Sequence, residues 1–102
     1  MDWEKVDKAI NSLIVKLWLR YRKYKTKCQT KKKIVAFCTF MEQLKIHAKC
    51  KELDLCVILI KKSTPPEKFL YKHKDENLDD YRLLKKSMNE EWQTILILFG
   101  LI

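Results

Sequence analysis

The stretch WEKVDKAINSLIVKLWLRYRKYKTKC, Trp3 to Cys28, decides the fold of this chain. Its apolar residues recur at steps of three and four, which is the spacing of one face of an α-helix. They are Trp3, Val6, Ile10, Leu13, Ile14, Leu17, Tyr21, Tyr24 and Cys28. Asp2 precedes the pattern and suits the N-cap position, and Glu4 suits the positive end of the helix dipole. The sequence therefore predicts a long amphipathic helix from Trp3 to Cys28.

Two further stretches show the same periodicity and are predicted to be helices. The first runs from about Lys31 to Lys51. Its apolar stripe is Ile34, Phe37, Cys38, Met41, Leu44 and Ala48. The second follows a cap at Asn77 or Asp75, and Gly100 followed by Leu101 is typical of a Schellman stop at its end. Its stripe is Leu78, Tyr81, Leu84, Met88, Trp92, Ile95 and Phe99.

The segment between these two helices is ambiguous. LDLCVILIKK (Leu53–Lys62) fits an extension of the second helix and also a short buried strand, because periodicity alone does not separate the two. Downstream, Thr64 can cap a helix that has Pro65 at its first position and Glu67 three residues after the cap. The competing interpretation is a hairpin over residues 55–74 that turns at the two prolines. We expect the helix start.

The scarcity of turn-forming residues indicates the fold class. The chain has one glycine and two prolines in 102 residues, whereas β-rich folds need a turn about every 8–12 residues. This length supports one domain with a single core. We therefore predict a single helical domain over residues 1–102, an all-α bundle of three to four helices. The alternative is an α+β fold that contains the hairpin over residues 55–74.

The positive charge of the chain is concentrated at the end of the first predicted helix. The net charge is +9, and residues 18–33 hold eight cationic side chains and no acid. Several of these cations share one face of the helix, at about 100° per residue, and a lysine triplet continues the charge into the next turn. This predicted basic ridge consists of Lys16, Arg20, Arg22, Lys23, Lys27, Lys31, Lys32 and Lys33. It is either a solvated lysine-rich face or a surface that binds nucleic acid or an acidic protein.

The residue types in this stretch argue against specific recognition of a nucleic acid sequence. The cations of the chain are 19 Lys and 3 Arg, and Arg is the side chain suited to bidentate phosphate contacts. Tyr21 and Tyr24 fall on the apolar stripe, so we expect them to pack inward and not to form a base-stacking platform. A basic amphipathic helix with Trp3 and Trp18 as anchors could instead lie on a membrane surface, and this is the alternative function.

The C-terminal stretch TILILFGLI (Thr94–Ile102) is apolar on all sides and not on one face. A helix of this kind must be buried on several sides. Either it is the central element of the bundle, or part of it is a surface for a protein partner or a second copy of the chain. The predicted protein interface is Trp92, Ile95, Leu96, Leu98, Phe99 and Leu101.

Catalytic and metal-binding patterns are weak in this sequence. The only glycine is Gly100, so there is no Gly-rich phosphate loop. The adjacent acid pairs cannot form a facing dyad by themselves, because neighbours in a helix point in different directions. The four cysteines include no Cys-x2-Cys pair of the kind that binds zinc, and Cys38 fits a buried apolar position. We expect no enzymatic activity, no cofactor, no metal and no small-molecule substrate.

The termini carry no targeting pattern. Asp2 and Glu4 stand where a signal peptide needs cations, and the apolar run 95–102 is far shorter than the roughly 20 residues of a spanning helix. We expect an intracellular protein, cytoplasmic or nuclear, with reduced thiols. The predicted function is that of a small interaction protein or assembly subunit that uses the basic ridge and the C-terminal apolar surface.

Overall fold

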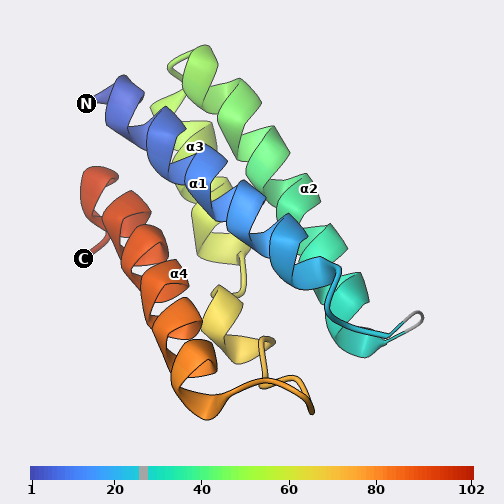
Figure 1. The fold of residues 1–102 in the computed structure, drawn as a ribbon. Helices are drawn as coiled ribbons and strands as arrows, with labels where there is room; N and C mark the ends of the chain where they lie inside the picture. Colours follow the sequence, from blue (N-terminus) through green and yellow to red (C-terminus); the bar gives the residue numbers. More distant parts are fainter. Residues whose placement is uncertain (26–27) are drawn as a thin grey trace.

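The computed structural model describes residues 1–25 and 28–102. These residues form a helical bundle with one additional 3-10 turn (Figure 1). The elements are α1 (Trp3–Tyr21), α2 (Gln29–Lys49), α3 (Leu53–Lys62), η1 (Pro66–Lys68) and α4 (Leu78–Leu98). The described residues contain no strand, so the all-α prediction is confirmed and the hairpin over residues 55–74 is wrong.

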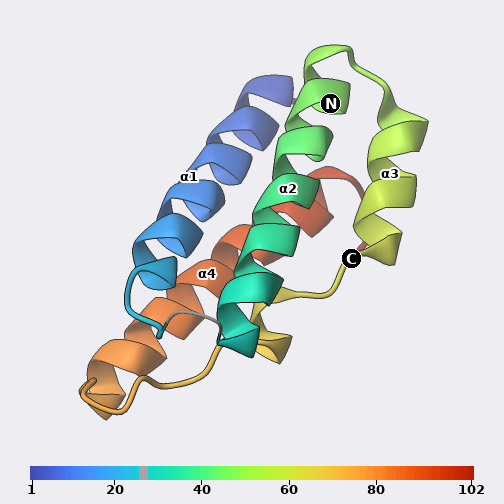
Figure 2. The same ribbon diagram turned by 90° about the vertical axis from the view of Figure 1, so that its right-hand side faces the viewer.

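The core forms where α1 lies against both α2 and α4. α3 packs on α2, and η1 packs on α4 (Figure 2). The apolar stripe of α1 is buried as the periodicity predicts, and the stripes of α2 and α4 meet it. The fully buried apolar side chains include Val6, Ile10, Leu13, Leu17, Ile34, Met41, Leu44, Met88 and Ile95. Burying one side chain of this size contributes about 1.5–3 kcal/mol, so each of these positions adds to the driving force for folding.

The first helix ends earlier than its periodicity predicts. α1 ends at Tyr21, and the predicted extension to Cys28 is wrong. The backbone N–H of Tyr24 donates to the carbonyl oxygen of Tyr21 at 3.3 Å, in a turn that brings the Tyr24 ring into the core. There its hydroxyl donates to the carbonyl oxygen of Tyr71 at 2.7 Å. Tyr24 is therefore buried as predicted, but from a turn and not from the helix.

α3 is a separate helix, because a Schellman motif ends α2 before it. Lys51 has a φ of 57°, in the left-handed region. Its N–H donates to the carbonyl oxygen of Ala48 at 3.0 Å. The N–H of Glu52 donates to the carbonyl oxygen of His47, also at 3.0 Å. Leu53–Lys62 is therefore helical, but it does not continue α2. A lysine occupies the position that favours glycine.

Replacing Lys51 with glycine is expected to stabilise the protein by about 1 kcal/mol, because a side chain in the left-handed region is strained and glycine is not. Gly100 provides the matched reverse test: its φ is 70° and a Cβ there meets no atom within 4 Å, so Gly100→Ala adds only backbone strain. In urea unfolding, the midpoint of Lys51→Gly should be higher than that of the wild type, and the midpoint of Gly100→Ala should be lower. A Lys51→Gly midpoint at or below that of the wild type would contradict the assignment of strain.

After α3 the chain forms a single 3-10 turn and not the predicted longer helix. η1 spans Pro66–Lys68, with Pro65 in the N-cap position, so Thr64 does not cap a helix. Glu67 does not reach back to form a capping box, because its carboxylate accepts a hydrogen bond from Asn89 of α4 at 2.9 Å. Phe69, directly after the turn, is buried in the core. The tertiary contacts of Glu67 and Phe69 therefore limit this segment to a single 3-10 turn.

Both predicted ends of the last helix are confirmed. The Asn77 side chain accepts hydrogen bonds from the N–H groups of Asp79 and Asp80 and caps α4. At the other end, the N–H of Gly100 donates to the carbonyl oxygen of Ile97, and the N–H of Leu101 donates to the carbonyl oxygen of Leu96. This is the hydrogen-bond pattern of a Schellman motif.

Candidate functional site

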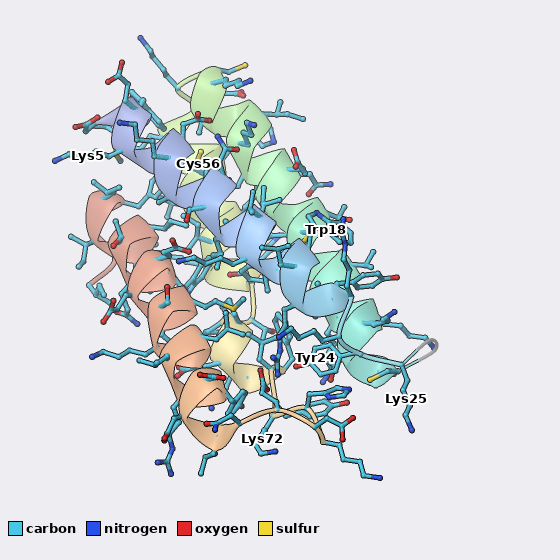
Figure 3. All side chains as sticks on the ribbon, in the orientation of Figure 1. Lys5, Trp18, Tyr24, Lys25, Cys56 and Lys72 are labelled. Carbon is cyan, nitrogen blue, oxygen red and sulfur yellow. The ribbon has the colours of Figure 1, made fainter. Side chains whose placement is uncertain are left out.

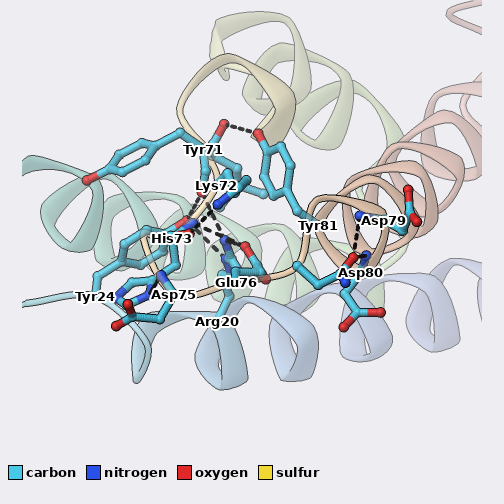
Figure 4. A network of polar contacts seen from close by, with 12 residues as sticks. Arg20, Tyr24, Tyr71, Lys72, His73, Asp75, Glu76, Asp79, Asp80 and Tyr81 are labelled. Carbon is cyan, nitrogen blue, oxygen red and sulfur yellow. Dashed lines mark hydrogen bonds and ion pairs between the residues drawn. The ribbon is translucent and has the colours of Figure 1, made fainter.

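Arg20 is not part of an exposed ridge, because its side chain is buried between α1 and the segment before α4 (Figure 4). It is 2% exposed. Its Nη2 donates to Oε1 of Glu76 at 2.6 Å and to the carbonyl oxygen of Tyr71 at 2.9 Å, while its Nη1 donates to Oε2 of Glu76. Its Nε donates to the hydroxyl oxygen of Tyr24 at 3.0 Å. Arg20 lies three residues after Leu17, a spacing that already indicates the core face.

The contacts of Arg20 also change the acidity of its neighbours. The pKa of Glu76 is lowered, chiefly because the Arg20 guanidinium hydrogen-bonds to its carboxylate. The backbone N–H of His73 donates to the same carboxylate at 3.1 Å. The pKa of Tyr24 is raised, chiefly because its ring is buried. This network joins α1 to residues 71–76 and is a structural element of the bundle, so it does not present Arg20 to a partner.

Lys16, at the start of the predicted ridge, is also held inside the bundle. Its Nζ donates to Oγ of Ser87 at 2.6 Å and to Oε1 of Glu91 at 2.8 Å. Ser12 donates to the same Glu91 oxygen. Lys16 is therefore half-buried in a polar contact between α1 and α4, and its charge is compensated by Glu91.

Lys23 lies beside several acids. It shares a shallow pocket with His73, Asp75, Glu76 and Asp80, which belong to the segment before α4 and to its first turn. Its positive charge contributes to lowering the pKa of Glu76. The surface at Lys23 is therefore of mixed charge, and the predicted ridge does not continue through it.

A smaller basic surface remains where α1 passes into α2, at one end of the bundle. Figure 3 shows Lys25 projecting away from the helices there. Lys27, which belongs to the predicted ridge, lies outside the described residues. We call the remaining set the basic end; it comprises Arg22, Lys25, Lys31, Lys32 and Lys33. None of these five side chains forms an ion pair with a carboxylate among the described residues.

The start of α2 adds to this positive charge. The first turn of α2 contains no acid, and its N-cap, Cys28, makes no side-chain capping hydrogen bond. The lysine triplet therefore lies near the positive end of the α2 dipole, where acids are favourable and lysines are not. It consists of Lys31, Lys32 and Lys33. The Nζ of Lys31 lies 4.5 Å from the centre of the Tyr21 ring, and this cation–π contact offsets part of the repulsion.

Half of the predicted C-terminal interface lies in the core. Trp92, Ile95 and Phe99 are buried, so the structure does not present them on a surface. The other three residues of that prediction are half-buried and pack against the core; they are Leu96, Leu98 and Leu101. The exposed apolar side chains of this end are Ile97 and Ile102. Apolarity on all sides does not mean full burial here, because one face packs in the core while Ile97 and Ile102 remain exposed.

The tryptophans of the first helix lie in different environments. Trp3 is half-buried and packs edge-on against Phe99, with 6.1 Å between ring centres. Trp18 is 39% exposed and packs edge-on against Tyr21. Because the main apolar stripe of α1 is in the core, the large apolar side chains that α1 itself leaves exposed to a lipid surface are Val15, Trp18 and Leu19. No helix in the described part of the chain is long and apolar enough to cross a membrane.

The cysteines are all free thiols, in contrasting environments. Burial raises the pKa of Cys38 to about 11, and Cys38 is a core residue as predicted. Cys28 is half-buried beside the basic end, and its pKa is lowered, chiefly because the hydroxyl of Tyr71 hydrogen-bonds to its sulfur at 3.0 Å. A lower pKa increases the thiolate fraction, which is the nucleophilic form.

The described residues contain no group of three or more His, Cys, Asp and Glu side chains that could hold a metal ion. His47 pairs with Glu52, with Nδ1 3.0 Å from Oε1. The chain matches no protein-family model, no curated protein and no solved structure.

Proposed function

We propose that this protein is a small, non-catalytic interaction domain that binds an acidic macromolecule through the basic end. The observation that carries the proposal is the contrast between two groups of cations. Lys16 and Arg20 are ion-paired within the bundle, whereas the five residues of the basic end have no carboxylate partner among the described residues. Other lysines of the described chain also lack an ion pair, but at the basic end such cations adjoin the start of α2, whose first turn contains no acid, so this charge is available to an external anion.

The energetics of α2 support the same proposal. Each cation near the N-terminus of a helix is unfavourable by about 0.3–1 kcal/mol, and the charges of a lysine triplet also repel one another. A bound polyanion offsets both costs, so binding at this end relieves electrostatic repulsion that is already present in the free protein. This arrangement supports recognition of negative charge density and not of one sequence, because lysine is a point charge without the bidentate geometry of arginine.

A salt series tests the proposal. Fluorescence anisotropy with labelled polyglutamate and with a labelled single-stranded oligonucleotide should show binding at low salt that weakens steadily as salt rises. The double variant Lys25→Glu/Lys32→Glu should bind at least about tenfold more weakly, because two contacts become repulsive. The matched control Lys8→Glu/Lys86→Glu changes the net charge equally at exposed sites on α1 and α4, and should bind as the wild type does.

The outcomes of this series separate the possible partners. Preference for polyglutamate identifies an acidic protein, and preference for the oligonucleotide identifies a nucleic acid. Anionic vesicles form the third probe, since exposed Trp18 beside the basic end is the one observation that favours the membrane-surface alternative. Equal weakening by the double variant and by its control would mean that net charge alone drives binding, and would overturn the assignment to the basic end.

A further inference from the structure

An apolar pocket opens beside the basic end, between α2 and the chain that leaves α3. Its volume is about 270 Å³. Ala36, Phe37 and Phe40 of α2 form one wall, and Thr64 and Phe69 lie on the other side. Figure 2 shows α2 beside the connection that runs from α3 to η1. Its lining combines three phenylalanine rings with Lys33 of the basic end.

The aromatic rings of the pocket are fixed by the core behind them. The ring of Phe37 lies 5.4 Å from that of Phe40 and 5.7 Å from that of Phe69, measured between centres. Phe37 also packs edge-on against the buried Trp92, at 5.5 Å. Pro65 and Pro66 do not line the pocket, but they lie in the chain between Thr64 and Lys68 of the opposite wall and restrict its φ angles. The pocket is therefore preformed, and a ligand would bind without the cost of ordering its walls.

Two lysines stand at the rim of this apolar pocket. Lys33 comes from α2 and belongs to the basic end, and Lys68 comes from η1. Neither forms an ion pair within the described part of the chain. The acid next to Lys68 in sequence, Glu67, accepts its hydrogen bond from Asn89 of α4 instead. The pocket thus presents an apolar interior and two positive charges from different elements.

We propose that this pocket receives one large apolar side chain of an acidic protein segment, whose carboxylates on either side of that anchor pair with Lys33 and Lys68. The inference rests on the proposed function, and it names an acidic protein as the partner. The volume supports it, because the pocket lies below the roughly 300–1,000 Å³ of sites that enclose a whole ligand and suits a single anchor. A buried aromatic or aliphatic anchor surrounded by polar contacts is the usual arrangement at protein interfaces.

Two labelled peptides test the proposal directly. The first is a short run of Asp and Glu with one central Phe, and the second has Ser in place of that Phe. The Phe peptide should bind at least about tenfold more tightly, because the anchor is transferred from water into the pocket. A single-stranded oligonucleotide of equal charge is the third probe, and it should not compete better than the Ser peptide does.

Ala36→Trp fills the pocket from an exposed position of α2 and should abolish the advantage of the Phe peptide while leaving the binding of the Ser peptide unchanged. Gln43→Trp is the matched control, exposed on the same helix but not part of the pocket lining, and should keep that advantage. Lys68→Glu should weaken both peptides. Binding to the unmutated protein should also shift the amide resonance of Ala36, which gives a readout that needs no variant.

The results distinguish this inference from the proposed function. Equal binding of the Phe and Ser peptides, or an unchanged preference in Ala36→Trp, would overturn the pocket while leaving salt-dependent binding at the basic end intact. Stronger binding of the oligonucleotide than of the Phe peptide would overturn the choice of an acidic protein. Loss of all salt-dependent binding would instead remove the proposed function itself.

Discussion

Replacing Arg20 with alanine is expected to lower the free energy of unfolding by about 3–5 kcal/mol, because removing one partner of a buried ion pair leaves the other charge buried alone. The charge left without its partner is the carboxylate of Glu76, whose side chain is 8% exposed. The carbonyl oxygen of Tyr71 and the hydroxyl of Tyr24 lose a donor at the same time. Urea unfolding of the variant and of the wild type measures the difference.

A double variant separates the ion pair from the packing of the side chain. Arg20→Met together with Glu76→Gln removes both charges and keeps similar volumes, so it should recover much of the lost stability. Lys5→Ala is the control, because the Lys5–Asp2 pair is exposed and contributes little. An Arg20→Ala variant that costs under about 1 kcal/mol, as an exposed pair does, would contradict the buried network.

The stability from Glu76 should also depend on pH, with a definite sign. Its pKa is lower in the folded protein than in the unfolded chain, so its contribution is fully present above the unfolded pKa. That contribution is lost as pH falls through the lower, folded pKa. The stability difference between the wild type and Glu76→Gln should therefore be constant near neutral pH and shrink below about pH 4.3, the ordinary value for glutamate.

Replacing Trp92 with alanine is expected to lower the free energy of unfolding by a similar amount, about 3–5 kcal/mol, because a large core side chain is removed and a cavity remains. Trp92 is 3% exposed and packs edge-on against Phe37 and Phe40. This prediction separates the two interpretations of the C-terminal stretch. An interface residue on the surface of the free protein would change its stability by no more than about 0.5 kcal/mol.

Ile97 is the matched control on the same helix, since it is apolar and 60% exposed. Ile97→Ala should leave the urea midpoint close to that of the wild type. If Trp92→Ala behaved like Ile97→Ala, the packing of α4 against α2 would be wrong. The urea midpoint of Trp92→Phe, which keeps an aromatic ring, should lie between those of Trp92→Ala and Ile97→Ala.

The helices of this fold could be predicted from the sequence because their apolar stripes depend only on local spacing. The stripe of α1 and both ends of α4 agree with the structure, since periodicity, an Asn cap and a glycine stop are all encoded within a few residues. The end of α1 could not be predicted in the same way. It depends on Tyr24 reaching the carbonyl oxygen of Tyr71, a contact between residues 47 positions apart.

The site was harder to predict than the fold for the same reason. Charge counting places Arg20 with the other cations, but its partner Glu76 lies 56 positions away, and no local pattern joins them. Lys16 and Glu91 are separated in the same way. The pocket beside the basic end combines α2 with residues from the α3–η1 connection, so it exists only once the bundle has formed.

The buried Arg20 network has a consequence for the alignment of the helices. Leucine and isoleucine stripes are tolerant, and two of them can slide past each other by a turn with little loss of apolar contact. A guanidinium with fixed donor directions is not tolerant, because only one alignment of α1 with residues 71–76 gives it Glu76 and two further acceptors together. We therefore expect Arg20 to favour this register over others that the apolar residues alone would permit. An all-apolar replacement would keep the bundle but lose that uniqueness.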